Sequence, residues 1–428
     1  MKRYEKYKPT GIQWLPEIPE HWNIKYLFQV SHEHYISNKD IHHQNLLSLS
    51  YGKIVHKDIN TTEGLLPASF DTYQIIEPGN IVFRFTDLQN DHKSLRVGLS
   101  KETGIITSAY IAVEVDTIYI LPEYFYYTLH SFDIKKLFYS MGSGLRQSLN
   151  YNGIRKLRLP IPPIDEQIKT IAYLDKRITL IENCKCQRER ELQTLNELKQ
   201  AEIASVVTRG LNPDVPMKDS GIPWIGQIPS HWETMRIRGL FKESDEKTVD
   251  ESGTLLSLSQ YSGITRKADA GKTGMFEAES TIGYKIVHPG QFVMNIMLAW
   301  NGSYAVSDLE GIISPAYCVF DFRLDCNKKY YDYLLRTKAY CGAFKTQSRG
   351  IIDSRLRLYP YKFYAFKTLV PPIEEQNAIV EYIESKTNKI DTMIEALKAE
   401  IDRLTEYKQR LISDVVTGQI DVRGEQIQ

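Results

Sequence analysis

The sequence has few cysteines and no long apolar run, and each absence excludes a class of protein. Its 428 residues include 5 cysteines, which form no even, short-spaced framework typical of disulfide-stapled secreted folds. Cys184 and Cys186 lie two residues apart in a strongly helical stretch and so point to different faces, which disfavours a metal pair. The N-terminus is polar, and no stretch approaches about 18 apolar residues. We therefore expect a folded cytoplasmic protein without a membrane span.

The chain also lacks net charge, with 53 basic and 53 acidic residues. The balance differs locally, because residues 1–160 carry 18 basic and 16 acidic groups and residues 217–370 carry 20 and 16. A protein that binds nucleic acid unaided is usually more basic than this. If the chain binds DNA, partner proteins are expected to supply part of the phosphate contact.

Motifs that carry catalysis or hold a metal are also missing. The sequence AGKTG (270–274) resembles the end of a phosphate-binding loop, but Arg266 stands in place of the required first glycine. The histidines between positions 32 and 56 lack the helical spacing and the cysteine partners of a metal site. No GxSxG nucleophile elbow appears either. The sequence therefore predicts no catalytic residue and no metal site.

What the chain does contain is one long unit that occurs twice. GIQWLPEIPEHW (11–22) returns as GIPWIGQIPSHW (221–232), PPIDEQ (162–167) as PPIEEQ (371–376), and SVVTRG (205–210) as DVVTGQ (414–419). The starting positions differ by 210, 209 and 209 residues, so this is a duplication and not a short solenoid repeat. Between the matched segments the halves diverge strongly. A shared framework with different filling predicts two similar modules that recognise two different targets.

The composition of each half predicts a mixed α/β block followed by a long helix. The runs at 75–85 and 284–295 have strand composition around a Pro-Gly turn. The double prolines at 162–163 and 371–372 each start a helix whose apolar residues recur at heptad spacing. Isolated helices of this kind would leave their apolar seams in water, so we expect them to pack on each other. The predicted fold class is α/β, with two pseudo-twofold-related α/β domains separated by two long antiparallel coiled-coil helices.

The repeat also predicts the domain boundaries. They are residues 1–160 for the first α/β domain, 161–212 for the first spacer helix, 213–370 for the second α/β domain and 371–428 for the second spacer helix. Lys185 and Arg188 interrupt the apolar seam of the first helix, and Thr387 interrupts that of the second. The stretch from Ile164 to Val207 would span roughly 65 Å at about 1.5 Å per residue. Such helices would act as a rigid spacer.

Two segments in each half carry residue types that bind DNA. One is the glycine-bearing loop before the double proline, and the other is the polar segment after the Pro-Gly strand. Arginine, glutamine and asparagine can read base edges in pairs of hydrogen bonds, while hydroxyls and lysines bind phosphates. A solvated loop would have the same composition, so this alternative stays open. The DNA-binding candidates are Arg84, Thr86, Gln89, Asn90, Lys93, Ser143, Gly144, Arg146, Gln147, Ser148, Asn295, Trp300, Asn301, Ser303, Arg349, Arg355, Arg357, Tyr361 and Lys362.

These duplicated motifs resemble the specificity subunit of Type I restriction–modification enzymes, over essentially the whole chain. The marks are the W…IPxHW entry, the GSG loop at 142–144, the PPIDEQ and PPIEEQ helix starts, and the VVTRG and VVTGQ helix ends. The second glycine loop departs from the GSG form. The resemblance implies two target-recognition domains, each reading half of an asymmetric, interrupted sequence in double-stranded DNA. It also implies docking of two adenine-N6 methyltransferase subunits and of restriction subunits.

The same resemblance implies that the chain is not an enzyme and binds no cofactor, with S-adenosylmethionine, ATP and Mg held by the partner subunits. Three alternatives stay open. An enzyme with an unrecognised site would need a methyl-transfer or nuclease motif, and none is seen. A coiled-coil scaffold without DNA specificity leaves unexplained why the blocks diverge while their frame persists. An orphan subunit that modifies DNA without cutting it fits the sequence as well.

Overall fold

The computed structural model describes residues 2–39, 43–59, 67, 69–88, 91, 95–141, 148–260, 262–269, 280–350 and 356–425. Contacts divide the chain into two compact units, of which unit 1 comprises Met1–Glu189 with Ala399–Gln428 and unit 2 comprises Arg190–Lys398. Each unit therefore holds one α/β block and a part of both long helices. Within the described ranges, no helix has the length and apolar character needed to cross a membrane.

The α/β block of unit 1 follows the strand pattern expected from its short β-branched runs. Its elements are β1 (Tyr7–Ile12), β2 (Leu15–Pro19), β3 (Asn23–Tyr26), η1 (Leu27–Gln29), β4 (Ser31–His34), β5 (Ile36–Ser37), β6 (Leu47–Ser50), β7 (Lys53–His56), β8 (Gln74–Ile76), β9 (Ile81–Phe83), β10 (Val97–Leu99), β11 (Gly104–Ile106), β12 (Ile111–Val115), α1 (Pro122–Ile134), η2 (Leu137–Ser140), α2 (Tyr151–Ile154) and β13 (Arg158–Ile161). A four-stranded sheet has the order β10-β9-β12-β4, and a three-stranded sheet has the order β11-β8-β5.

The block of unit 2 repeats this plan. Its elements are β14 (Met217–Asp219), β15 (Gln227–Pro229), β16 (Glu233–Arg236), α4 (Ile237–Leu240), β17 (Phe241–Ser244), β18 (Leu256–Ser259), β19 (Gly263–Arg266), β20 (Lys285–Val287), β21 (Phe292–Asn295), η3 (Ala299–Asn301), β22 (Tyr304–Val306), β23 (Gly311–Ile313), β24 (Tyr317–Phe322), α5 (Lys328–Leu335), α6 (Lys338–Gln347), α7 (Pro360–Phe363) and β25 (Lys367–Val370). Its four-stranded sheet, β17-β24-β21-β22, matches β4-β12-β9-β10 strand by strand. The duplication seen in the sequence is therefore a duplication of topology.

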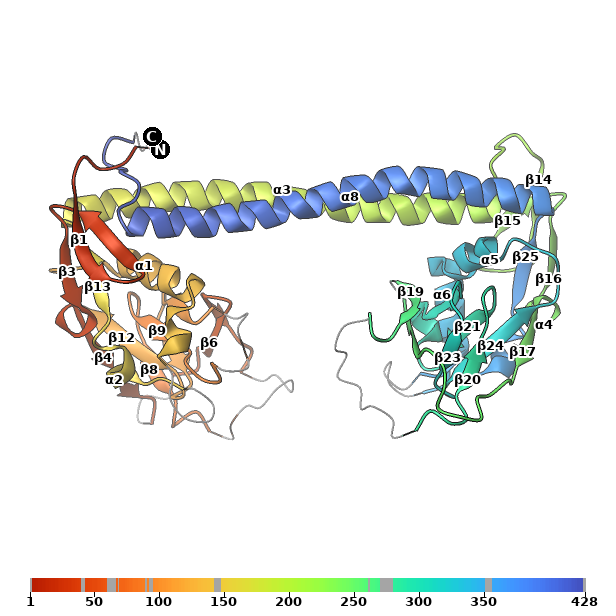
Figure 1. The fold of residues 1–428 in the computed structure, drawn as a ribbon, viewed down its shortest axis with the longest axis horizontal. Helices are drawn as coiled ribbons and strands as arrows, with labels where there is room; N and C mark the ends of the chain where they lie inside the picture. The colour runs from red at the N-terminus through yellow and green to blue at the C-terminus, as the bar shows by residue number, and fades with distance from the viewer. Residues whose placement is uncertain are drawn as a thin grey trace. The chain divides into compact units, whose positions relative to one another are not determined.

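Two long helices, α3 (Ile164–Arg209) and α8 (Ile373–Val416), follow the double prolines (Figure 1). Acidic residues in both first turns suit the positive end of the helix dipole. In unit 1, Glu182 pairs with Lys408 at 2.5 Å and Arg188 pairs with Glu400 at 3.0 Å. Rising numbers in α3 meet falling numbers in α8, so the helices are antiparallel there, as predicted. Arg188, which interrupts the apolar seam, thus has an acidic partner on the facing helix.

Unit 2 contains the remaining parts of both helices, and their direction is the same. Lys199 Nζ lies 2.6 Å from Asp391 Oδ1, and the Tyr382 hydroxyl donates to Glu202 Oε1 at 2.5 Å. Apolar seam positions such as Ile390 and Ile394 are buried between the helices. The α/β fold class and the paired long helices are thereby confirmed, while the predicted domain boundaries stay a prediction.

The duplicated sequence motifs meet at one point in each unit, where a buried tryptophan joins the two helices. In unit 1, Trp22 Nε1 donates to Glu166 in the first turn of α3 at 2.9 Å. Gly418, just after the end of α8, has φ +73°, and a Cβ there would lie 3.2 Å from the Trp22 ring and would overlap Pro19 Cδ. Gln167 Nε2 donates a hydrogen bond to the Pro162 carbonyl at 3.0 Å, across the start of α3. The entry, helix-start and helix-end motifs are therefore parts of one joint.

Unit 2 builds the same joint from the second copy of each motif. Trp232 Nε1 donates to Glu375 at 2.9 Å, and a Cβ on Gly210 would lie 3.3 Å from the Trp232 ring. Gln376 Nε2 donates to the Pro371 carbonyl at 2.8 Å. These shared contacts explain why these motifs persist while the sequence between them diverges.

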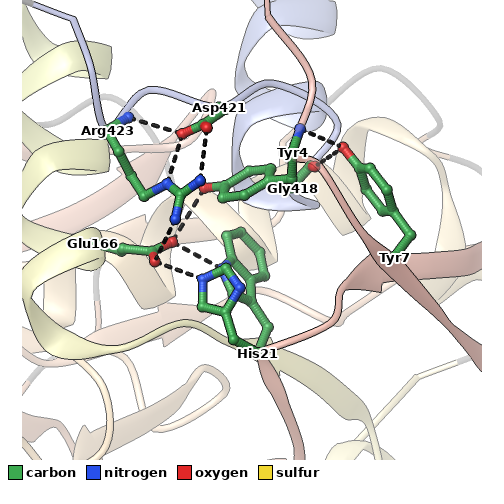
Figure 2. A network of polar contacts seen from close by, with 8 residues as sticks. Tyr4, Tyr7, His21, Glu166, Gly418, Asp421 and Arg423 are labelled. Atoms are coloured by element: carbon green, nitrogen blue, oxygen red, sulfur yellow. Dashed lines mark hydrogen bonds and ion pairs between the residues drawn. The ribbon is translucent and has the colours of Figure 1, made fainter.

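The joint of unit 1 contains additional groups, which Figure 2 shows. Glu166 accepts hydrogen bonds from the Tyr4 hydroxyl at 3.1 Å and from His21 Nε2 at 2.6 Å, and Arg423 approaches it at 3.9 Å. Arg423 also makes two 2.9 Å contacts with Asp421. The Glu166 side chain is 6% exposed, whereas that of Glu375 is 38% exposed. Residues from both ends of the chain therefore enclose this carboxylate in unit 1.

We expect Glu166→Ala to destabilise unit 1 by about 3 kcal/mol, because it leaves the Tyr4 hydroxyl, the Trp22 indole and Arg423 without their shared acceptor. The matched variant Glu375→Ala should cost unit 2 only about 1 kcal/mol, since Glu375 is partly solvated. Hydrogen exchange measured separately on peptides from each unit checks both values. Equal losses in the two units would contradict the role given to the additional groups.

Candidate nucleic-acid interface

In unit 1 the structure brings together the two predicted DNA-binding segments. Arg84 and Thr86 follow β9, and Ser148 lies exposed at the end of the glycine loop. The backbone N–H of Leu149 donates to the Phe85 carbonyl at 3.3 Å, and this hydrogen bond links the two segments. The candidates Gln89, Asn90, Lys93, Ser143, Gly144, Arg146 and Gln147 lie outside the described residues.

Unit 2 joins its two segments by the same contact. The N–H of Leu358 donates to the Ile296 carbonyl at 2.8 Å, at positions that correspond to Leu149 and Phe85. Arg349 and Arg357 form an antiparallel bridge with reciprocal hydrogen bonds of 3.0 and 2.9 Å. Arg355 lies outside the described residues. In each unit, a backbone hydrogen bond between residues 64 or 62 positions apart in sequence therefore brings the two segments together.

The surface of unit 2 combines cationic and aromatic side chains. Tyr359 and Tyr361 stack with ring centroids 6.1 Å apart, and the Arg349 guanidinium lies 5.9 Å from the Tyr361 ring. Tyr361 is 55% exposed. Lys345 of α6 lies 4.8 Å from the centre of the Trp300 ring. Positive groups beside exposed rings can bind phosphates and stack on bases or sugars.

The other candidates in unit 2 differ in how far they are buried. Asn295 is buried, and its Oδ1 accepts the Met297 N–H at 3.0 Å. Ser303 is also buried, at the start of β22's pairing with β21. Asn301 is exposed, and Lys362 donates to Gln347 at 3.3 Å. Contact of these residues with DNA stays a prediction.

Sequence reasoning did not single out three residues in or beneath these surfaces. Lys345 and Tyr359 lie beside chosen candidates, and the abundance of tyrosine gave no reason to prefer one. Arg96 precedes an ordinary apolar strand, and no local pattern marks it. Its N–H donates to Asp133 of α1, and burial raises the pKa of that carboxyl to about 6. Only the fold shows that Arg96 lies beneath the loop after β9.

Among the described residues there is no group of three or more His, Cys, Asp or Glu side chains arranged to hold a metal ion. The described surfaces thus consist of binding groups: guanidinium, ammonium, amide and aromatic side chains on two similar α/β frames. They define a chain with two candidate binding surfaces of different composition, one in each unit.

Comparison with known proteins agrees with this description. No family model matches the chain. The chain is 23% identical, over 98% of its length and 97% of the relative's, to a putative type I restriction enzyme MjaX specificity subunit of Methanocaldococcus jannaschii. Its fold is similar to that of a chain from a solved type I R-M system, with a TM-score of 0.65, 16% identity, and coverage of 94% of this chain and 99% of that one.

A further similar structure is the HsdS subunit from Thermoanaerobacter tengcongensis, with a TM-score of 0.46 and 16% identity, covering 94% of this chain and 98% of that subunit. The sequence similarity to a type I specificity subunit and the fold shared with the type I R-M chain confirm the predicted resemblance.

Proposed function

We propose that this chain is the DNA-specificity subunit of a type I restriction–modification system and reads a two-part, asymmetric target, one half with each unit. The observation that carries the proposal is that the same backbone contact, Leu149 to Phe85 and Leu358 to Ile296, joins surfaces with different side chains. Recognition of two different half-sites requires different DNA-contacting side chains on a shared backbone framework. The full-length similarity to a specificity subunit supports the same conclusion.

The chain's own part in this function is binding. Arg349, Arg357 and Lys362 supply positive charge in unit 2, and Tyr359 and Tyr361 supply stacking surface. In unit 1, Arg84, Thr86 and Ser148 occupy the corresponding place. Residues of both types position phosphates and read base edges in protein–DNA complexes. Methyl transfer and cleavage belong to other subunits in this proposal.

The partners in the proposal are two adenine-N6 methyltransferase subunits and restriction subunits, which bind S-adenosylmethionine, ATP and Mg. The small positive excess of the blocks, 18 against 16 and 20 against 16 charged groups, supports partners that add phosphate contacts. The solved relative comes from work on complex assembly of a type I R-M system, which makes an assembled complex the natural form to test.

The test is whole-genome mapping of N6-methyladenine in a methylation-free host that expresses the chain with its adjacent methyltransferase. We expect one new interrupted motif that is absent when the methyltransferase is expressed alone. If the two proteins are soluble and associated but produce no motif, the scaffold reading gains support. Methylation that does not require this chain would exclude the proposal.

A further inference from the structure

Arg96 has a buried side chain beneath the segment that follows β9. Its side chain is 0% exposed. The residue precedes β10, and its carbonyl accepts the Arg84 N–H at 2.8 Å, so its backbone extends the β9–β10 ladder by one step. A buried guanidinium is costly unless its donors are paired, so its partners reveal what it holds in place.

Those partners are mainly backbone carbonyls of the candidate DNA-binding segment. Arg96 Nη1 donates to the Thr86 carbonyl at 3.0 Å and to the Arg84 carbonyl at 3.4 Å. Nη2 donates to the Asp87 carbonyl at 3.4 Å and also to the carbonyl of Asp91, whose carboxylate lies 3.7 Å away. One planar group thus holds the backbone carbonyls of Arg84, Thr86, Asp87 and Asp91.

The same cluster also reaches η2, the short helix that precedes the second candidate segment of unit 1. Arg96 Nε donates to the Tyr139 hydroxyl at 3.3 Å, and this hydroxyl donates to the Asp91 carbonyl at 3.2 Å. Tyr139 belongs to η2, which directly precedes the glycine loop that ends at Ser148. The Arg96–Tyr139 pair therefore links the segment after β9 to η2 inside the block.

In unit 2 a serine stands in the place of Arg96. In the matched ladders Val97 pairs with Phe83 and Tyr304 with Met294, which places Ser303 at the position of Arg96. The segment after β21 is shorter and holds its own turn, because Asn295 Oδ1 accepts the Met297 N–H and Trp300 Nε1 donates to the Met297 carbonyl. A buried guanidinium at this position of the ladder is therefore a feature of unit 1, whose segment is longer.

We infer that Arg96 is a positioning residue for sequence readout by unit 1. It holds the segment after β9 in the conformation that binds the first half-site, and it does not contact DNA itself. The inference rests on the proposed function. A loop whose carbonyls lose their common donor would sample several conformations, and base contacts depend on geometry that a shared anchor supplies. Discrimination at one half-site should therefore depend on Arg96, while the other half-site should not.

The experiment compares Arg96→Lys and Tyr139→Phe with wild type, each expressed with the methyltransferase and mapped for N6-methyladenine. Binding of the purified complexes to cognate and singly mismatched duplexes is measured alongside. We expect discrimination at the unit 1 half-site to fall about tenfold, which is within the effect of one mismatched base pair, and the unit 2 half-site to keep its preferences. Arg336→Lys is the matched control, because Arg336 donates to the Tyr304 carbonyl of β22 at 2.8 and 3.0 Å and to no carbonyl of the candidate loops among its described contacts.

Two outcomes would overturn the inference. One is unchanged base preference at every position of both half-sites in both variants. The other is an equal loss of binding at both half-sites, which would mean that Arg96 only stabilises the fold. If Arg96→Lys fails to assemble, Tyr139→Phe decides, since it removes one hydroxyl and keeps the ring. A wild-type complex with no two-part motif would refute the proposed function instead.

Discussion

A chain that carries the first α/β block twice should direct methylation to a motif in which the same half-site occurs twice. The second natural half-site should disappear, with a loss of preference of about 1,000-fold or more, as between specific and non-specific DNA binding. The physical reason is that each block would bring its own readout surface on an unchanged frame. Methylation mapping of the engineered chain with its methyltransferase measures the result.

The structure supplies the cut points for this exchange. Each block begins and ends in one antiparallel strand pair, in which Asn23 of β3 faces Ile161 of β13 and Glu233 of β16 faces Val370 of β25. Residues 23–161 would therefore replace residues 233–370, leaving both tryptophan joints intact.

The transplanted block also finds matching partners on the helices. The Tyr124 hydroxyl donates to the Val416 carbonyl at 3.0 Å, and the Tyr330 hydroxyl makes the same contact with Val207 at 2.8 Å. The reciprocal chain, with two copies of the second block, serves as the control and should show the other half-site twice. A hybrid that keeps the natural asymmetric motif would contradict assignment of one half-site to each unit.

Lengthening both long helices by seven residues at matched points should lengthen the unread spacer by about three base pairs while both half-sites stay the same. Seven residues add about 10 Å to a helix and keep the heptad seam in register, and DNA rises about 3.4 Å per base pair. Insertion after Glu189 in α3 and after Lys398 in α8 leaves the Arg188–Glu400 pair on one side and Lys199–Asp391 on the other.

The control for this experiment is insertion in α3 alone. This shifts the residues of α3 relative to their partners on α8, so the helices lose their pairing register and assembly should decrease. Mapping of methylated sites gives the spacer length directly. An unchanged spacer in a folded, active complex with both insertions would refute the idea that the helices set the distance between the half-sites.

Much of the frame could be predicted because its signals are local or repeated. The double prolines with acids after them mark the starts of α3 and α8, and the heptad spacing predicts that these helices pair. The antiparallel direction followed from the duplication itself. By contrast, the run at 328–344 has the composition of a single helix but is divided into α5 and α6 around Arg336 and Thr337. The Arg336 guanidinium binds the Tyr304 carbonyl there, a long-range contact that no local pattern predicts.

The candidate surfaces were predictable only as segments. Residue types at 84–94 and 348–362 pointed to DNA, but type alone cannot separate Asn295, buried inside its turn, from Asn301, which is exposed. Nor could it identify Arg96, because an arginine before a strand is ordinary in sequence and is distinguished here only by the carbonyls that converge on it.

The sequence by itself determined the duplication, the α/β class, the two long helices and the resemblance to specificity subunits, because these depend on repeated motifs and on periodicity along the chain. The tertiary structure decided which distant segments meet: Trp22 with Glu166 and Gly418, Phe85 with Leu149, and Arg96 with the loop above it. Such contacts join residues far apart in sequence, and their geometry depends on packing of the whole block.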